Sequence, residues 1–173
     1  PQSKKEMVYF RMGEMFLSVK GEESEKERVN RLEQAVASFR KISEESNYYL
    51  KAKYLQGYAY AELGKLEKAE SMFDEVANLR KGTTLNDVNR VAAILGLGRI
   101  YYQGKQWDKA IAAYRKIPRD SLFWHEGIFE LSWYLLRSGR FRTALSHFQT
   151  LHSAYYNDFY NPETLLLRSI VYL

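Results

Sequence analysis

The chain has 173 residues, of which 46% are hydrophobic and 27% charged, and this composition excludes a disordered segment and predicts one globular unit. It has no cysteine, which excludes disulfides and thiolate metal sites, and no apolar run approaches the roughly 20 residues that cross a bilayer. The net charge of +5 is unevenly distributed: residues 1–87 hold 15 basic and 15 acidic residues, and residues 88–173 hold 11 and 6. The basic half is either an attractive surface for an acidic partner or nucleic acid, or only a solvated one.

The ends of the sequence point to a longer parent protein. The chain starts at Pro1, with neither an initiator methionine nor a signal peptide, and it stops at Leu173 inside an apolar helical pattern. We interpret it as a fragment of a longer protein, so that any targeting signal lies outside it.

The first predicted unit, about residues 6–45, contains two helical patterns. Gly13 is the small residue of the first pattern, and Ala35, Phe39 and Ile42 form the second, with an aromatic four and an aliphatic seven positions after the alanine. Between the two patterns, a charged stretch around residues 21–25 adds ten residues relative to the later units. It predicts a surface loop or a helix extension.

Three further units follow, at about residues 48–80, 88–118 and 122–154. In each of them a small residue lies 12 positions before an alanine, and an aromatic and an aliphatic residue follow the alanine by four and seven. The sets are Gly57, Ala69, Phe73 and Val76; Gly98, Ala110, Tyr114 and Ile117; and Ser132, Ala144, Phe148 and Leu151. Seven extra residues around 81–84 separate the second unit from the third.

A partial fifth unit, residues 161–173, begins with Asn161-Pro162 as a helix start and ends before its second helix. Its apolar residues would have no covering helix, which makes self-association through this end a third functional hypothesis.

The spacing predicts pairs of antiparallel helices, each with one buried stripe, stacked into a single array. The small residues are expected where two helices approach closely. Gly64 and Gly139 are expected to take positive φ at the ends of first helices, and Gly104 to do so one position early. Asp120-Ser121 supplies a candidate helix cap.

This pattern resembles the tetratricopeptide repeat, with its 34-residue period, small residue in the first helix, glycine at the turn, and alanine followed by an aromatic residue. The resemblance implies an all-α, right-handed superhelical α-solenoid of about four and a half repeats. The stretch from Trp124 through Phe141, His152 and Pro162 is also similar to repeat proteins of the bacterial cell envelope, which implies a periplasmic or envelope location, with a cytoplasmic one as the alternative.

The resemblance further implies that the first helices line a concave groove that binds a protein or peptide partner. Residues carried over to that groove are Phe10, Tyr54, Tyr58, Leu95, Arg99, Tyr102, Phe129, Trp133 and Arg137. Aromatic and arginine side chains are typical anchors of binding interfaces, and this set favours a partner with apolar anchors and some negative charge. The alternative is that an adjoining segment of the same protein covers the aromatic residues. Glu14 would repel a carboxylate, which argues against capture of a C-terminal carboxylate.

Residue patterns for catalysis, cofactors or metal binding are not found, and the sequence predicts a protein that is not an enzyme. His147 and His152 are five residues apart and would not share a helix face well enough to hold a metal ion. Gly96 and Gly98 lack the third glycine of a phosphate loop. Nucleic-acid binding by a basic helical array stays open as the alternative function, although the groove positions are mostly apolar and the basic residues are scattered over several helix faces.

Overall fold

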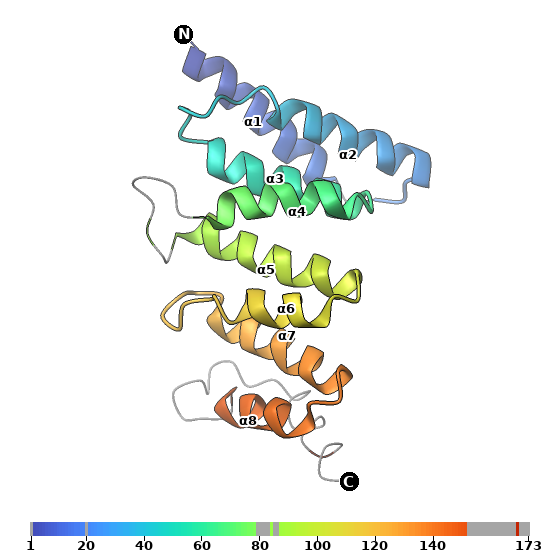
Figure 1. Ribbon diagram of the computed structural model, residues 1–173. Coiled ribbons are helices and arrows are strands. Elements are labelled where there is room, and N and C mark those ends of the chain that lie inside the picture. Colours follow the sequence, from blue (N-terminus) through green and yellow to red (C-terminus); the bar gives the residue numbers. More distant parts are fainter. Residues whose placement is uncertain (1, 20, 79–83, 85–86, 152–168, 170–173) are drawn as a thin grey trace.

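The computed structural model describes residues 2–19, 21–78, 84, 87–151 and 169. Within these residues the chain forms eight helices and no strand: α1 (Gln2–Ser18), α2 (Glu25–Phe39), α3 (Tyr49–Glu62), α4 (Leu66–Ala77), α5 (Val88–Gln103), α6 (Trp107–Tyr114), α7 (Trp124–Arg137) and α8 (Phe141–Leu151). The helices stack in chain order, with the turns inside each pair at one edge and the connections between pairs at the other (Figure 1). The architecture is the all-α repeat solenoid that the sequence predicts. The predicted fifth unit, residues 161–173, lies outside the described residues apart from Ser169.

Each hairpin is held by a contact between the small residue of its first helix and the aromatic residue of its second helix. A Cβ atom added at the glycine would meet the ring in three pairs: Gly13–Phe39 (2.4 Å), Gly57–Phe73 (2.8 Å) and Gly98–Tyr114 (2.2 Å). In the fourth pair Ser132 and Phe148 take these positions, and both are fully buried. Glycine recurs because the ring fills the volume that a side chain would need. The close approach expected at these positions is therefore between a helix backbone and an aromatic ring.

The turns inside the pairs depend on a residue with positive φ seven positions after the small residue. Gly64 (φ 69°) and Gly139 (φ 76°) meet this expectation. The expectation for Gly104 is wrong, because its φ is −75° and the left-handed conformation falls on Lys105 (φ 56°), seven positions after Gly98. The phase of the helix fixes where the left-handed residue must lie, so Lys105 adopts this conformation despite the steric cost of its Cβ atom.

The predicted cap at Asp120-Ser121 is also wrong. Helix α7 begins at Trp124, three residues later than that cap implies, and its N-cap residue Phe123 makes no side-chain cap hydrogen bond. The Ser121 amide instead donates to the carbonyl oxygen of Pro118 (3.1 Å). The segment therefore forms a turn between α6 and α7.

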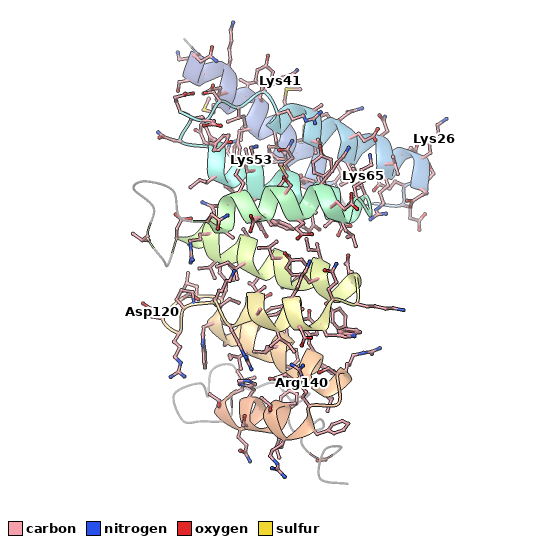
Figure 2. All side chains as sticks on the ribbon, in the orientation of Figure 1. Lys26, Lys41, Lys53, Lys65, Asp120 and Arg140 are labelled. Atoms are coloured by element: carbon pink, nitrogen blue, oxygen red, sulfur yellow. The ribbon has the colours of Figure 1, made fainter. Side chains whose placement is uncertain are left out.

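The ten-residue insertion in the first pair is mostly helix. Helices α4, α6 and α8 begin three residues before their alanines, whereas α2 begins ten residues before Ala35. Seven of the ten residues thus lengthen α2 by about two turns, which keeps its apolar face in phase. A reciprocal Ser24–Glu27 capping box starts the helix, and Lys26 lies at its projecting tip (Figure 2). Arg28 fastens the extension to Glu62 of α3 (2.8 Å).

The seven-residue insertion before the third pair also extends helices. Helix α4 continues eight residues past Ala69, compared with four past the alanine in α2 and α6 and seven in α8. Helix α5 begins ten residues before Gly98, two more than the corresponding starts of α3 and α7. Asp87 caps α5 by accepting hydrogen bonds from the amides of Asn89 and Arg90 (3.0 Å each). Both insertions therefore leave the stacking of the pairs intact.

Candidate functional site

The first helices α1, α3, α5 and α7 supply one continuous face of the array, which we call the first-helix face. One position after the small residue, the four helices carry Glu14, Tyr58, Arg99 and Trp133. Tyr58 is 44% exposed, Arg99 is exposed, and Glu14 and Trp133 are half-buried. Since these positions are equivalent in the repeat, a partner lying across the array would meet them in turn.

Two of the residues expected on the groove are core residues instead. Phe10 and Leu95 are each 2% exposed. The Phe10 ring stacks on Tyr48 (ring centroids 4.8 Å apart), and the Lys51 ammonium group lies over it (5.1 Å). Leu95 belongs to the core cluster around α5 and α7, beside Gly127. Both residues lie three positions before the small residue of their helix, where the side chain points into the seam between neighbouring helices. Neither residue therefore belongs to the binding surface.

The remaining predicted residues are accessible to different degrees. At the seam position that holds Phe10 and Leu95 in the other helices, Tyr54 and Phe129 are half-buried. Tyr54 also packs at 5.9 Å from Phe73, and burial raises the pKa of its hydroxyl. Arg137 is exposed at the end of α7. Of the predicted groove residues, three are exposed (Tyr58, Arg99 and Arg137) and four are half-buried (Tyr54, Tyr102, Phe129 and Trp133).

Arg99 is not the free cation that the sequence suggests. Its Nε atom donates to both carboxylate oxygens of Glu130 (3.0 and 3.1 Å), and its Nη2 atom donates to Glu126 (2.6 Å). The hydrogen bonds to Glu130, followed by the charges of both carboxylates, raise the pKa of the guanidinium above its usual value. Two carboxylates surround one guanidinium, so this part of the face does not attract an acidic ligand.

Glu130 also anchors a tyrosine network that ties α5, α6 and α7 together. The Tyr114 hydroxyl donates to Glu130 and lies 3.1 Å from the Tyr134 hydroxyl. The Tyr134 ring stacks on Tyr102 (4.1 Å, 22°). Burial is the main cause that raises the pKa of Tyr134, to about 12, and it likewise raises that of Tyr114. Both hydroxyls stay protonated donors at neutral pH, and the predicted groove residue Tyr102 is committed to this packing.

Replacing Glu130 with glutamine is expected to lower the free energy of unfolding by about 1–3 kcal/mol, because charge-assisted bonds from Arg99 and Tyr114 are lost or weakened. The matched variant Glu126→Gln removes only the charge assistance of one exposed bond from Arg99, and its effect should stay below about 1 kcal/mol. Urea unfolding followed by circular dichroism measures both values. Equal effects of the two substitutions would contradict a network centred on Glu130.

Ion pairs at equivalent repeat positions link two of the pairs of neighbouring first helices. The residue one position after the small residue pairs with the residue six positions before the small residue of the next repeat. Glu14 of α1 pairs in this way with Lys51 of α3 (2.8 Å), and Arg99 of α5 with Glu126 of α7. Between α3 and α5 the same positions hold Tyr58 and Ala92, which is buried. The step between α3 and α5 therefore has no ion pair at these two positions and presents the exposed ring of Tyr58, although Arg28 and Glu62, which pair with each other, lie nearby.

Within the described ranges, no group of three His, Cys, Asp or Glu side chains could hold a metal ion, and no helix is long and apolar enough to cross a membrane. The imidazoles of His125 and His147 lie partly inside the array, and burial lowers the pKa of each. His152 lies outside the described residues.

Comparison with known proteins gives the same repeat. Two family models, each described as a tetratricopeptide repeat, match residues 50–83 and 92–120. A crystal structure from Podosopora anserina, described as "putative kinesin light chain nearly identical TPR-like repeats", is 17% identical, with 98% of this chain and 84% of that chain covered and a TM-score of 0.65. A crystal structure of a substituted form of the same Podosopora anserina protein is 16% identical, with the same coverage and TM-score. No curated protein matches the chain. The repeat register, the hairpin contacts and these matches together show that the chain is a tetratricopeptide-repeat protein.

Proposed function

We propose that this chain is a protein–protein interaction scaffold whose first-helix face binds a peptide segment of its partner. Tetratricopeptide repeats generally mediate interactions between proteins, and stacked repeats present an extended surface suited to that task. The observation that carries the proposal is the exposed ring of Tyr58, which lies between the Glu14–Lys51 and Arg99–Glu126 ion pairs along the first helices. Such a ring offers apolar area at low entropic cost.

The charge of the face indicates the chemistry of the peptide. Glu14 and Arg99, which flank Tyr58 along the array, are both occupied by partners on neighbouring helices. Breaking these pairs to admit a charged ligand would cost their hydrogen bonds. We therefore expect a peptide with aromatic or aliphatic anchors at Tyr58 and Trp133 and with little net charge between them. An acidic group is expected only toward Arg137, which has no ion-pair partner within the described residues.

The proposal is tested by selecting binding peptides from a displayed random library and measuring their dissociation constants with the whole chain. Only peptides that also bind the variant Arg115→Glu are kept. Because Arg115 lies at the end of the second helix α6, this step discards peptides that bind the side formed by the second helices. Substitution Tyr58→Ala or Trp133→Ala is expected to weaken binding by about tenfold or more, equivalent to roughly 1.4 kcal/mol or more. The control Phe141→Ala removes a ring that is 54% exposed on a second helix and should leave the affinity unchanged.

If the two first-helix substitutions and the control change the affinity equally, or if none of them changes it, the first-helix face is not the binding surface. Circular dichroism of each variant confirms that the helices are retained.

A further inference from the structure

Two clefts open between successive second helices, away from the first-helix face. The first lies between α4 and α6 over α5 and has a volume of about 450 Å³. The second lies between α6 and α8 over α7 and has a volume of about 540 Å³. Helix α6 is the wall that they share, so one extended ligand could enter both by crossing α6.

The clefts are the same site in consecutive repeats. Ile94 and Leu97 form the floor of the first, and Ile128 and Leu131, each 34 residues later, form the floor of the second. The α6 wall of the first cleft includes Ala112, whose equivalent in the second is Ser146 of α8. The repeat therefore gives the array two clefts with aliphatic floors, one repeat apart.

The walls of both clefts are basic. Lysine or arginine side chains on or just after α6 contribute to each: Lys109 and Lys116 to the first, and Arg115 and Arg119 to the second. All four are exposed. The first cleft has one acidic lining residue, Asp74, which accepts a hydrogen bond from Asn78 (3.1 Å), and the described lining of the second has none. We call these four side chains the α6 ridge.

Several basic residues elsewhere in the array are neutralised, whereas those of the α6 ridge are not. Lys51, Arg99 and Arg140 each pair with a carboxylate. In the described part of the chain no carboxylate pairs with a residue of the α6 ridge, and Lys109 only lies over the ring of Tyr101 (5.3 Å). Lys105, Arg137 and Arg142 also form no ion pair within the described residues, but they line neither cleft, so the α6 ridge is the group of unpaired cations beside the clefts.

A role in helix capping accounts for only part of the ridge. Arg115 and Lys116 lie at the C-terminal end of α6, where the helix dipole favours cations. Lys109 lies in the first turn, where the dipole disfavours a cation, and Arg119 lies beyond the helix. The positive field extends into the second cleft, since burial first and Arg115 second lower the pKa of His147. Stabilisation of α6 therefore does not explain the whole cluster.

We propose that the second-helix side binds an acidic peptide segment of a partner protein, with carboxylates on the α6 ridge and an apolar side chain in each cleft. Charge complementarity supplies the attraction, and the Ile and Leu floors supply the anchors. Tyr101 also lines the first cleft, and Tyr114 and Trp124 line the second, so an oligonucleotide that stacks its bases is the competing ligand that the experiment must exclude. This site is separate from the first-helix face, and the two proposals can fail independently.

The probe is a fluorescently labelled peptide pool composed of Asp, Glu, Leu and Ser, from which the tightest member is taken for anisotropy titration with the whole chain. Arg115→Glu is expected to raise its dissociation constant by about tenfold or more. Arg142→Glu makes the same charge change at an exposed position of α8 that lines neither cleft, and should raise it by less than about threefold. Tyr58→Ala should leave it unchanged.

A second pair of variants tests whether the peptide inserts a side chain into the first cleft or is only attracted by the positive charge. Ala112→Phe fills the mouth of the first cleft from an exposed position and should weaken binding by about tenfold, while Ala37→Phe, at the equivalent position of α2, should not. Equal effects of Arg115→Glu and Arg142→Glu, or no effect of Ala112→Phe, would overturn the proposal. Tighter binding of a single-stranded oligonucleotide at the same salt concentration would also overturn it.

Discussion

Replacing Phe73 with alanine is expected to lower the free energy of unfolding by about 3–5 kcal/mol. Phe73 is 2% exposed, and its ring fills the space beside Gly57 of its own pair and Gly96 of the next pair, where added Cβ atoms would come within 2.8 and 2.7 Å. Neither glycine has a side chain that could move into the cavity. The loss is a large share of the roughly 5–15 kcal/mol that stabilises a typical domain.

The control for Phe73 is Phe141→Ala, which removes the same ring from a position that is 54% exposed. Its effect should stay within about 0.5 kcal/mol. Urea unfolding monitored by circular dichroism gives both values, and the Phe73 variant should also unfold less cooperatively, because α4 joins the first half of the array to the second. A loss below about 1 kcal/mol for Phe73→Ala would show that the ring is not the wedge between these repeats.

Replacing Gly98 with alanine is expected to destabilise the chain by about 2–3 kcal/mol, although alanine is the better helix former. The new Cβ atom would lie 2.2 Å from the ring of Tyr114. That ring cannot move aside easily, since its hydroxyl donates to Glu130 and the ring packs at a tilt against Tyr134 (ring centroids 5.1 Å apart). The strain therefore passes into the network that joins α5, α6 and α7.

Gly104→Ala is the matched control, because Gly104 ends the same helix with a φ of −75° and its nearest neighbour is the movable side-chain end of Gln106 (3.3 Å). This change should be neutral within about 0.5 kcal/mol or slightly stabilising. Thermal unfolding of the two variants under one condition compares them. Equal melting temperatures would mean that Tyr114 yields to the added methyl group.

The fold could be predicted because its key contacts are local. In the last three hairpins the small residue and the aromatic residue, such as Gly57 and Phe73, are 16 residues apart, so one spacing repeated along the chain identifies these pairs. In the first hairpin the ten-residue insertion widens the spacing between Gly13 and Phe39 to 26. The sequence also indicates in part that the first insertion is helical. Ser24 and Glu27 have the spacing of a capping box, which favours the helix extension over the loop.

The accessible surface could be predicted only in part. Whether Phe10 or Leu95 faces solvent depends on residues of the neighbouring repeat, such as Tyr48 over Phe10, and repeat position alone does not report them. The pairing of Arg99 was visible in principle, since Glu126 stands at the complementary position of the next repeat. The α6 ridge was missed because Lys109 lies on α6 whereas its other members lie at or beyond the C-terminal end of that helix, and only the fold shows that they line the same two clefts.

The central claim is that the first-helix face carries the partner, and site-specific photo-cross-linking tests it most directly. The selected, weakly charged peptide is irradiated with two variants of the whole chain, Tyr58→p-benzoylphenylalanine and Phe141→p-benzoylphenylalanine, which place the same group on exposed positions of a first and a second helix. The account predicts a cross-link from position 58 that unlabelled peptide competes away, and none from position 141. A competed cross-link from position 141 alone would contradict it.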